Sequence, residues 1–290
     1  MSGLNFLAIV YSVSSCYNSN DRRECTKMPI INVENLIKKF NGFTAVDDIS
    51  FSVEEGEIFA FLGPNGAGKS TTIKMLTTLL RPTSGNIMMD GHDPVREQNK
   101  ARCSFGIVFQ DQSLDDELTA WENMEFHGVL YAVEKKERRQ KIEELLKLVD
   151  LWDRRKDLVK KFSGGMKRRL EIARGLLHRP KILFLDEPTL GLDPQTRNSL
   201  WQHVKELNQR EKVTVFFTTH YMEEAEKMAD RIAIIDHGKI IARGSAAELK
   251  EQTKASTLEE AFLSLTGNKI REEEASGLDH ARMFRNARRR

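Results

Sequence analysis

The sequence predicts an α/β fold whose main sheet is largely parallel. Residues 57–62, 181–185 and 213–218 are rich in apolar side chains, as are strands that are buried on both faces. Helical stretches lie between these runs, which is the order expected when crossover helices join parallel strands. A glycine-rich loop, residues 63–70, follows the first run directly and leads into a helical stretch. These three observations together favour one central sheet with flanking helices.

The chain before this loop divides into an unpatterned part and a strand-like part. Residues 1–28 carry Ser, Asn, Asp and Arg without periodicity, so we expect a flexible N-terminal extension. Residues 30–33 and 49–53 alternate apolar and polar side chains, which is typical of strands with one buried face. Gly56 interrupts that alternation and indicates a turn before the buried strand.

The rest of the chain alternates between strand-like and helical segments. Residues 105–109 and 231–236 are strand-like, whereas 118–158 place apolar side chains among Glu, Lys and Arg at helical spacing. The chain end is polar and basic. The predicted boundaries are 1–28 for the extension and 29–245 for the main domain, with a helical part at about 111–162. A C-terminal helical segment and basic tail follow at 246–290.

Composition excludes several classes of protein. The chain has 290 residues, of which 40% are hydrophobic, enough for a sizeable core. Its net charge of +2 gives no field that favours nucleic acid as the main partner. Three cysteines without paired spacing indicate neither a disulfide framework nor a zinc site, and a reducing compartment fits best. No apolar run approaches the roughly 18 residues of a membrane span, so we expect a chain that does not cross a membrane alone.

The glycine-rich loop at 63–70 predicts phosphate binding. It reads GPNGAGKS, which fits the pattern G-x-x-x-x-G-K-[ST] between a strand and a helix. Glycines let the backbone wrap around a phosphate, so that its N–H groups and the helix N-terminus face the anion. We expect Lys69 to reach the β- and γ-phosphates and the Ser70 hydroxyl to bind Mg²⁺. A glycine-rich turn with a solvated lysine is the alternative, and the flanking elements argue against it.

Two acidic residues end the second buried strand. Asp186 is placed at the sheet edge beside the loop, where a carboxylate suits Mg²⁺, mainly through a bound water. Glu187 follows directly and points elsewhere, so it can polarise an attacking water as a general base. The alternative is two acids that cap a strand before Pro188. Lys69 makes the hydrolytic interpretation the better one.

A second candidate anion site begins at Ser163. Ser163, Gly164 and Gly165 open a strongly helical stretch, so the serine side chain and the N–H groups of the first turn can face a phosphate. One chain does not need two such sites for one phosphate. A plain N-cap is the alternative for this serine.

The run FSGGM at 162–166, followed closely by ILFLDE at 182–187, resembles the signature motif and Walker B strand of ABC-type ATPases. The resemblance covers about residues 30–265, with the expected motifs in the expected order. It is greatest to ATP-binding subunits of ABC-2-type exporters, the group that contains the daunorubicin-resistance ATPases. Residues 191–194, 218–225 and 257–262 carry this narrower likeness. It implies a P-loop NTPase core, mostly parallel sheet with flanking helices, with an antiparallel β subdomain and an inserted α-helical subdomain.

The resemblance also assigns residues outside these motifs. Gln110 matches the Q-loop position, where an amide senses Mg²⁺ and the lytic water, although a surface glutamine is the alternative. His220 matches the switch histidine that contacts the γ-phosphate, and Asp193 matches the D-loop that communicates across a dimer. Phe40 lies where an aromatic ring stacks on adenine, with Phe43 a nearby competitor.

The site implied by the motifs and the resemblance together has three groups of residues. The catalytic residues are Lys69, Gln110, Glu187 and His220. The Mg²⁺ ligands are Ser70, Gln110 and Asp186. The residues that contact ATP are Phe40, Gly63, Pro64, Asn65, Gly66, Ala67, Gly68, Lys69, Ser70, Thr71, Ser163, Gly164, Gly165 and Asp193.

The resemblance implies an ATPase that works in a membrane transporter. In that family the second anion site closes over the ATP of a partner subunit, so two ATP molecules lie in a head-to-tail homodimer or pseudo-dimer. A separate multi-span permease holds the ATPase peripherally at the cytoplasmic face of the membrane, and no nucleic acid is expected. The signature has Met166 where glutamine is common, which removes one amide from the neighbourhood of the partner's nucleotide. Phe40 in place of tyrosine keeps the stacking face.

Two other functions are compatible with the ATPase motifs. A soluble ABC ATPase that acts on ribosomes or DNA is one, but such members usually carry two cassettes or long coiled-coil insertions. This chain has one cassette and a short segment between Gln110 and Ser163. A nucleotide-gated module without turnover is the other. Its expected mark is loss of the base or the switch residue, and Glu187 and His220 are both present.

Overall fold

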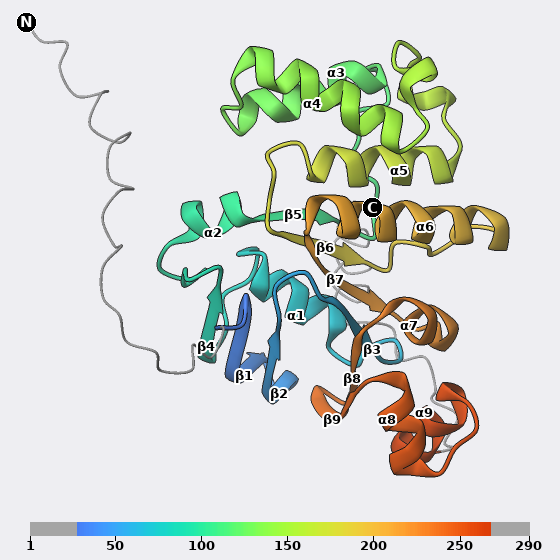
Figure 1. Ribbon diagram of the computed structural model, residues 1–290. Helices are drawn as coiled ribbons and strands as arrows, with labels where there is room; N and C mark the ends of the chain where they lie inside the picture. The colour runs from blue at the N-terminus through green and yellow to red at the C-terminus, as the bar shows by residue number, and fades with distance from the viewer. Residues whose placement is uncertain (1–27, 268–290) are drawn as a thin grey trace, which may run out of the picture.

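A computed structural model describes residues 28–267 (Figure 1). The predicted N-terminal extension, except Met28, and the basic tail lie outside the described residues. The strands are β1 Ile31–Phe40, β2 Phe43–Val53, β3 Ile58–Leu62, β4 Ser84–Met89, β5 Phe105–Val108, β6 Ile182–Asp186, β7 Thr214–Thr219, β8 Arg231–Asp236 and β9 Lys239–Gly244. The α-helices are α1 Lys69–Leu76, α2 Gln98–Ser104, α3 Ala120–Leu130, α4 Lys135–Leu148, α5 Gly164–Gly175, α6 Pro194–Glu211, α7 Met222–Met228, α8 Ala246–Thr253 and α9 Leu258–Thr266. Two 3₁₀ turns follow α4, namely η1 Trp152–Arg154 and η2 Val159–Lys161.

The strands form two sheets. The larger has the order β5-β6-β7-β3-β8-β9, in which every neighbouring pair is parallel except β8 and β9. The smaller has the order β2-β1-β4 and is antiparallel. The predicted α/β fold with a largely parallel main sheet and an antiparallel β subdomain is therefore confirmed. Parallel pairing aligns Leu62 with Thr219 and Asp186 with Thr218, so the carboxyl ends of β3, β6 and β7 meet at one edge.

Side chains on the central strands alternate between two separate cores. Phe59 and Phe61 of β3 face the antiparallel sheet and α1, whereas Ala60 and Leu62 face the helices on the other side. Alternation follows from the two-residue period of a strand, and it explains why these strands are apolar throughout. On the first side the rings form a contiguous cluster with centroids 5.5–6.0 Å apart. Its members are Phe51, Phe59, Phe61, Phe184 and Phe216.

A helical layer covers the other side, with α3 and α4 above α5 in Figure 1. Helix α3 begins at a capping box, in which Thr119 Oγ1 accepts from Glu122 N and the Glu122 carboxylate accepts from Thr119 N. Both α3 and α4 fall within the predicted helical part at 111–162, and α5 starts just after it. At the far end of α5, the Tyr131 ring of the turn after α3 stacks on His178 at 3.9 Å and lies 4.8 Å from His127.

The C-terminal helices pack beside the end of the larger sheet. Helix α8 starts at a capping box of Ser245 and Glu248, directly after β9. Helix α9 packs on α7, α8 and β9, and buries Leu258 and Phe262. Within residues 28–267, no helix combines the length and the apolar character that crossing a membrane requires.

Candidate functional site

The loop between β3 and α1 is shaped by close backbone packing. Gly68 precedes α1 with φ +106°, and a Cβ there would lie 2.6 Å from the Ala45 carbonyl oxygen, so only glycine fits. A Cβ on Gly63 would lie 2.4 Å from the Ile235 carbonyl oxygen. Asn65 and Gly66 are exposed at the tip of the loop. The N-terminus of α1 is thus held against β2 and β8, and its free N–H groups are available to an anion.

Lys69 is buried at the centre of the loop, with 4% of its surface exposed. Its Nζ donates to the carbonyl oxygens of Gly63 at 2.8 Å and Pro64 at 3.1 Å. It also lies 3.2 Å from Glu187 Oε1. Burial lowers the pKa of Lys69, and the carboxylates of Glu187 and Asp186 oppose that shift. The loop therefore holds the lysine Nζ, in contact with a carboxylate, where the phosphate-binding motif places it.

Asp186 lies at the end of β6 between two hydroxyl groups. Its Oδ1 accepts from Thr218 Oγ1 at 2.6 Å and from Ser70 Oγ at 3.2 Å. Burial raises the pKa of Asp186, and these two hydrogen bonds oppose the rise. A buried carboxylate beside a hydroxyl suits Mg²⁺, which takes few protein ligands and completes its shell with phosphate oxygens and water. In the described part of the chain, no cluster of three or more His, Cys, Asp or Glu could hold a metal ion by itself.

Glu187 lies between the lysine of the loop and the histidine after β7. Its Oε2 is 3.4 Å from His220 Nδ1, while Oε1 faces Lys69 Nζ. The backbone N–H of Glu187 donates to the carbonyl oxygen of Thr218 at 3.2 Å and to its hydroxyl at 3.0 Å. The structure thus brings three of the four predicted catalytic residues into mutual contact through one carboxylate. Sequence reasoning missed Thr218, which contacts both acidic residues.

Gln110 is placed differently from the other predicted catalytic residues. It follows β5 and is exposed, and its carbonyl oxygen accepts from Arg168 Nη2 at 2.9 Å. Between residues 28 and 267, no hydrogen bond joins its side chain to Ser70 or Asp186. β5 is the neighbour of β6 in the sheet, so Gln110 lies at the same edge as the acidic pair. Its role at the metal therefore stays a prediction.

The start of α5 lies at the surface. Ser163 caps the helix, its Oγ accepting from Met166 N at 3.3 Å, and both Ser163 and Gly164 are exposed. Gly165 is buried, and a Cβ there would lie 2.2 Å from Thr196 Cγ2 of α6. Met166 packs against the helical core, so its side chain serves the fold. Among the described residues, no hydrogen bond joins Ser163 to the loop at 63–71.

Asp193 lies beside this region, at the start of α6. It caps the helix, accepting from Thr196 N at 3.0 Å and Thr196 Oγ1 at 2.6 Å. These hydrogen bonds lower the pKa of Asp193, which is exposed. Because Gly165 packs on the same threonine, the starts of α5 and α6 form one surface.

The two candidate adenine platforms lie opposite each other at the turn between β1 and β2. Phe40 and Phe43 are paired in register, and both rings are exposed. Lys38 Nζ lies 5.0 Å from the centroid of the Phe40 ring. The two rings differ in two respects: Phe40 has this cation–π contact and is 47% exposed, whereas Phe43 is 62% exposed.

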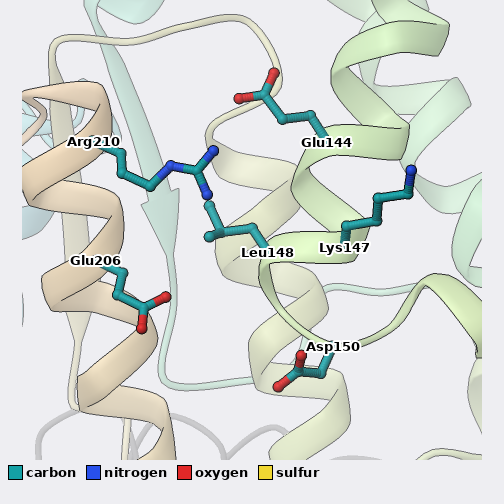
Figure 2. Close-up of a pocket in the computed structure, with 6 residues that line it drawn as sticks. All are labelled: Glu144, Lys147, Leu148, Asp150, Glu206 and Arg210. Atoms are coloured by element: carbon teal, nitrogen blue, oxygen red, sulfur yellow. The ribbon is translucent and has the colours of Figure 1, made fainter.

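Two hollows flank these elements. One, of about 250 Å³, is lined by Gly63, Pro64, Asn65, His220, Met222 and Phe262, so α9 reaches the edge of the phosphate loop. The other, of about 390 Å³, lies between α4 and α6, as Figure 2 shows. Its lining is mostly charged and includes no predicted site residue: Glu144, Lys147, Leu148, Asp150, Glu206 and Arg210.

Comparisons with known proteins agree with this geometry. A family model described as "ABC transporter" matches residues 46–190. The chain is 45% identical over 229 residues to the "Linearmycin resistance ATP-binding protein LnrL" of Bacillus subtilis (strain 168), covering 79% of this chain and 73% of that protein. It is 44% identical over 228 residues to the "Daunorubicin/doxorubicin resistance ATP-binding protein DrrA" of Streptomyces peucetius, covering 79% and 69%.

A solved structure that contains the products of ATP hydrolysis is also similar to this chain. It is a dimeric ATP-binding cassette in a post-hydrolysis state, bound to ADP and Pi. The two chains superpose with a TM-score of 0.67 at 30% sequence identity, over 74% of this chain and 98% of that one. The predicted resemblance to drug-resistance ATPases is confirmed, and the chain belongs to the ABC transporter family as one of its ATP-binding, ATP-hydrolysing subunits.

Proposed function

We propose that this chain hydrolyses Mg·ATP, bound at loop 63–71, to power export through a separate membrane subunit. The observation that carries the proposal is the contact of Glu187 with both Lys69 and His220, beside the pair formed by Ser70 and Asp186. A cation, a carboxylate base and a histidine meet where the N-terminus of α1 faces an anion. This combination suits water attack on a terminal phosphate.

Each residue then has a role that its surroundings support. The backbone N–H groups of the loop and Lys69 hold the β- and γ-phosphates, for which Lys69 exchanges its contact with Glu187. Ser70 and Asp186 would hold Mg²⁺, with Gln110 as a further ligand. A bound Mg²⁺ ion supplies positive charge that stabilises the phosphate oxygens.

The hydrolytic step needs a base and a group that contacts the γ-phosphate. Glu187 accepts a proton from water as the water oxygen bonds to the γ-phosphorus and the bond to the bridging oxygen of ADP breaks. His220 is within reach of the same carboxylate and contacts the γ-phosphate. Phe40 stacks on the adenine ring, with Phe43 as the rival platform.

The exposed starts of α5 and α6 support a dimer. Ser163 and Gly164 present free N–H groups to solvent, and Asp193 lies beside them. We infer that a second copy of the chain, or a related subunit, supplies its phosphate loop to this surface, so that two ATP molecules are enclosed head to tail. The solved neighbour described above is itself dimeric.

The outer face of α3 supports a membrane partner. Phe126, Val129 and Leu130 are exposed by 62%, 55% and 66%, and their spacing puts them on one side of the helix. Apolar side chains gathered in this way are typical of a contact surface. We propose that a multi-span permease docks here and holds the chain at the cytoplasmic face of the membrane, with 29–245 as the ATPase domain.

Export is favoured over work on ribosomes or DNA. The two relatives described above are named for resistance to linearmycin and to daunorubicin and doxorubicin. The net charge of +2 gives no reason to expect a nucleic-acid partner. We therefore infer a substrate that leaves the cell.

Phosphate release by the purified chain tests the proposal. Wild type should release phosphate from Mg·ATP, and Glu187→Gln should lose turnover while still binding ATP. Affinity purification of tagged Glu187→Gln chain from detergent-solubilised native membranes with ATP should recover a multi-span protein at near-equal amounts. Recovery of ribosomes or DNA in its place would contradict the transport role and leave the chemistry standing.

A further inference from the structure

Glu224 is a buried acid that the proposed mechanism does not use. It lies on α7, four residues after His220, with 4% of its surface exposed. Its Oε1 accepts from Thr189 Oγ1 at 2.5 Å, and its Oε2 accepts from Thr219 Oγ1 at 2.9 Å. Arg197 Nε lies 3.4 Å from Oε1.

These three partners come from the segments that carry the functional residues. Thr189 follows Glu187 by two positions, and Thr219 directly precedes His220. Arg197 lies on α6, one turn after the Asp193 cap. A single carboxylate therefore joins the turn after β6, the end of β7 and the start of α6.

Further hydrogen bonds and ring contacts lie within the segments that Glu224 joins. Leu190 N donates to the Glu187 carbonyl oxygen at 3.2 Å and Leu192 N to that of Thr189 at 3.1 Å, so the turn after β6 is closed. Tyr221 N donates to Thr219 Oγ1 at 2.9 Å. The Tyr221 ring lies 4.2 Å from the Arg197 guanidinium carbon and 4.1 Å from the His220 ring.

Placing a carboxylate in this buried position is unfavourable. Burying a charge costs free energy that an ion pair and hydrogen bonds only offset, and apolar side chains of similar size often stabilise a fold better. The two threonine hydroxyls each have one donor, and both are directed at Glu224. A carboxylate at this position is therefore better explained by the positions that it imposes on its partners than by a gain in stability.

We propose that Glu224 is a positioning residue that fixes Glu187 and His220 relative to each other and ties both to the start of α6. The inference rests on the proposed function, since it assigns a role through Glu187 and His220. Its consequence is that Glu224 affects the rate of the chemical step without touching ATP.

The test compares Glu224→Gln with Glu223→Gln. Glu223 is the neighbouring residue on the same helix, but its side chain is 86% exposed and its cation, Lys227, lies 3.7 Å away. Glutamine at 224 loses the charge facing Arg197 and one acceptor for a hydroxyl. We expect kcat to fall about tenfold or more while KM for ATP stays within about twofold, because misplacement of catalytic groups by a fraction of an ångström is costly. Glu223→Gln should match wild type.

A double variant separates positioning from folding. Thr219→Val removes one hydroxyl and keeps the other contacts of Glu224, so it also serves if Glu224→Gln does not fold. If both residues act through the same contact, Thr219→Val should lower kcat in the wild-type chain and have little further effect in Glu224→Gln. A melting temperature measured in parallel gives the folded fraction for each variant.

The outcomes differ for the two proposals. If Glu224→Gln and Thr219→Val lower only the melting temperature, with kcat per folded molecule equal to that of Glu223→Gln, the positioning role is wrong and the hydrolytic site stands. If Glu187→Gln releases phosphate as fast as wild type, the proposed function itself is wrong, and the role of Glu224 is lost with it.

Discussion

Helices α1 and α5 both begin at a glycine-rich turn, but their surroundings differ. The turn before α1 is packed under Ala45 and Ile235, and Lys69 is tied to the loop and to Glu187 within the same chain. The turn before α5 leaves Ser163 and Gly164 exposed, and within residues 28–267 the serine side chain bonds only its own first turn. The glycine-rich turn is thus enclosed by residues of the same chain at α1, whereas at α5 it faces solvent. The proposed dimer, in which a second copy completes the α5 turn, accounts for this difference.

The largest expected effect comes from disabling each turn in a separate chain. Lys69→Ala removes the cation at α1, and Ser163→Arg fills the exposed turn at α5, so each should lower phosphate release by about a hundredfold or more. In an equal mixture, half of the dimers are mixed, and each mixed dimer keeps one intact site of two. We expect about a quarter of wild-type activity from the mixture. Phosphate release before and after subunit exchange measures this.

The control for this experiment uses two changes on the same side of the site. Lys69→Ala mixed with Glu187→Gln leaves no intact site in any dimer, because both residues belong to the α1 half. That mixture should stay inactive. Equal activity of the Lys69→Ala and Ser163→Arg mixture and its separate components would show that α5 does not act in trans.

Two glycines of the α5 turn should differ in their effect on stability. A Cβ at Gly165 would lie 2.2 Å from Thr196 Cγ2, whereas a Cβ at Gly164 meets only Leu192 Cδ2, at 3.6 Å. Gly165→Ala should lower the free energy of unfolding by about 1–3 kcal/mol through overpacking. Gly164→Ala should change it by no more than about 0.5 kcal/mol. Urea unfolding of both variants measures the difference, and equal midpoints would contradict the close packing of α5 on α6.

A smaller effect is expected at the adenine end of the α1 site. Phe40→Leu removes the ring that is proposed to stack on adenine. Such stacking contributes about 0.5–1.5 kcal/mol of binding free energy, so the dissociation constant for ATP should rise by roughly two- to tenfold. Phe43→Leu is the control, since that ring is also exposed and pairs with Phe40 across the same turn. Titration with a fluorescent ATP analogue distinguishes the two. A larger effect from Phe43→Leu would identify that ring as the platform.

The smallest effect at neutral pH is expected from the buried histidines His127 and His178, near the C-terminal end of α5. Burial lowers the pKa of His127 from 6.5 to about 3, and burial also lowers the pKa of His178. The unfolded chain therefore binds more protons below about pH 6.5, so the free energy of unfolding should fall as pH drops from 6.5 towards 3. Above 6.5 these groups add no slope. His127→Phe keeps the ring and should flatten the decline in urea midpoints; an unchanged slope would contradict this origin.

The fold was predictable where burial is complete. β3, β6 and β7 have cores on both faces, so their apolar runs stand out in the sequence. β4 and β9 were not predicted, because β4 begins with the exposed residues Ser84, Gly85 and Asn86, and β9 has exposed Lys239 and Arg243. These strands form because β1 and β8 offer them hydrogen-bonding edges, which is a tertiary effect.

The candidate site was predictable only in its contiguous parts. Lys69, Asp186 and Glu187 lie in short motifs whose spacing reflects one chemical task. Thr218 and Glu224 make contacts between distant segments, and Glu224 looks in the sequence like any solvated glutamate of a helix. Their roles depend on which strands become neighbours. The roles assigned to the contiguous residues remain predictions for the experiments above.

The backbone of Glu187 has a consequence for how this family can change. Its φ of +46° lies in the left-handed region, which glycine and asparagine adopt more readily than glutamate, and two hydrogen bonds to Thr218 hold it there. The backbone conformation at position 187 therefore favours glycine or asparagine, whereas the proposed hydrolysis requires glutamate. Substitution by glycine or asparagine would relax the turn and remove the proposed base in one step. A folded, nucleotide-binding, silent cassette therefore lies one substitution from an active one.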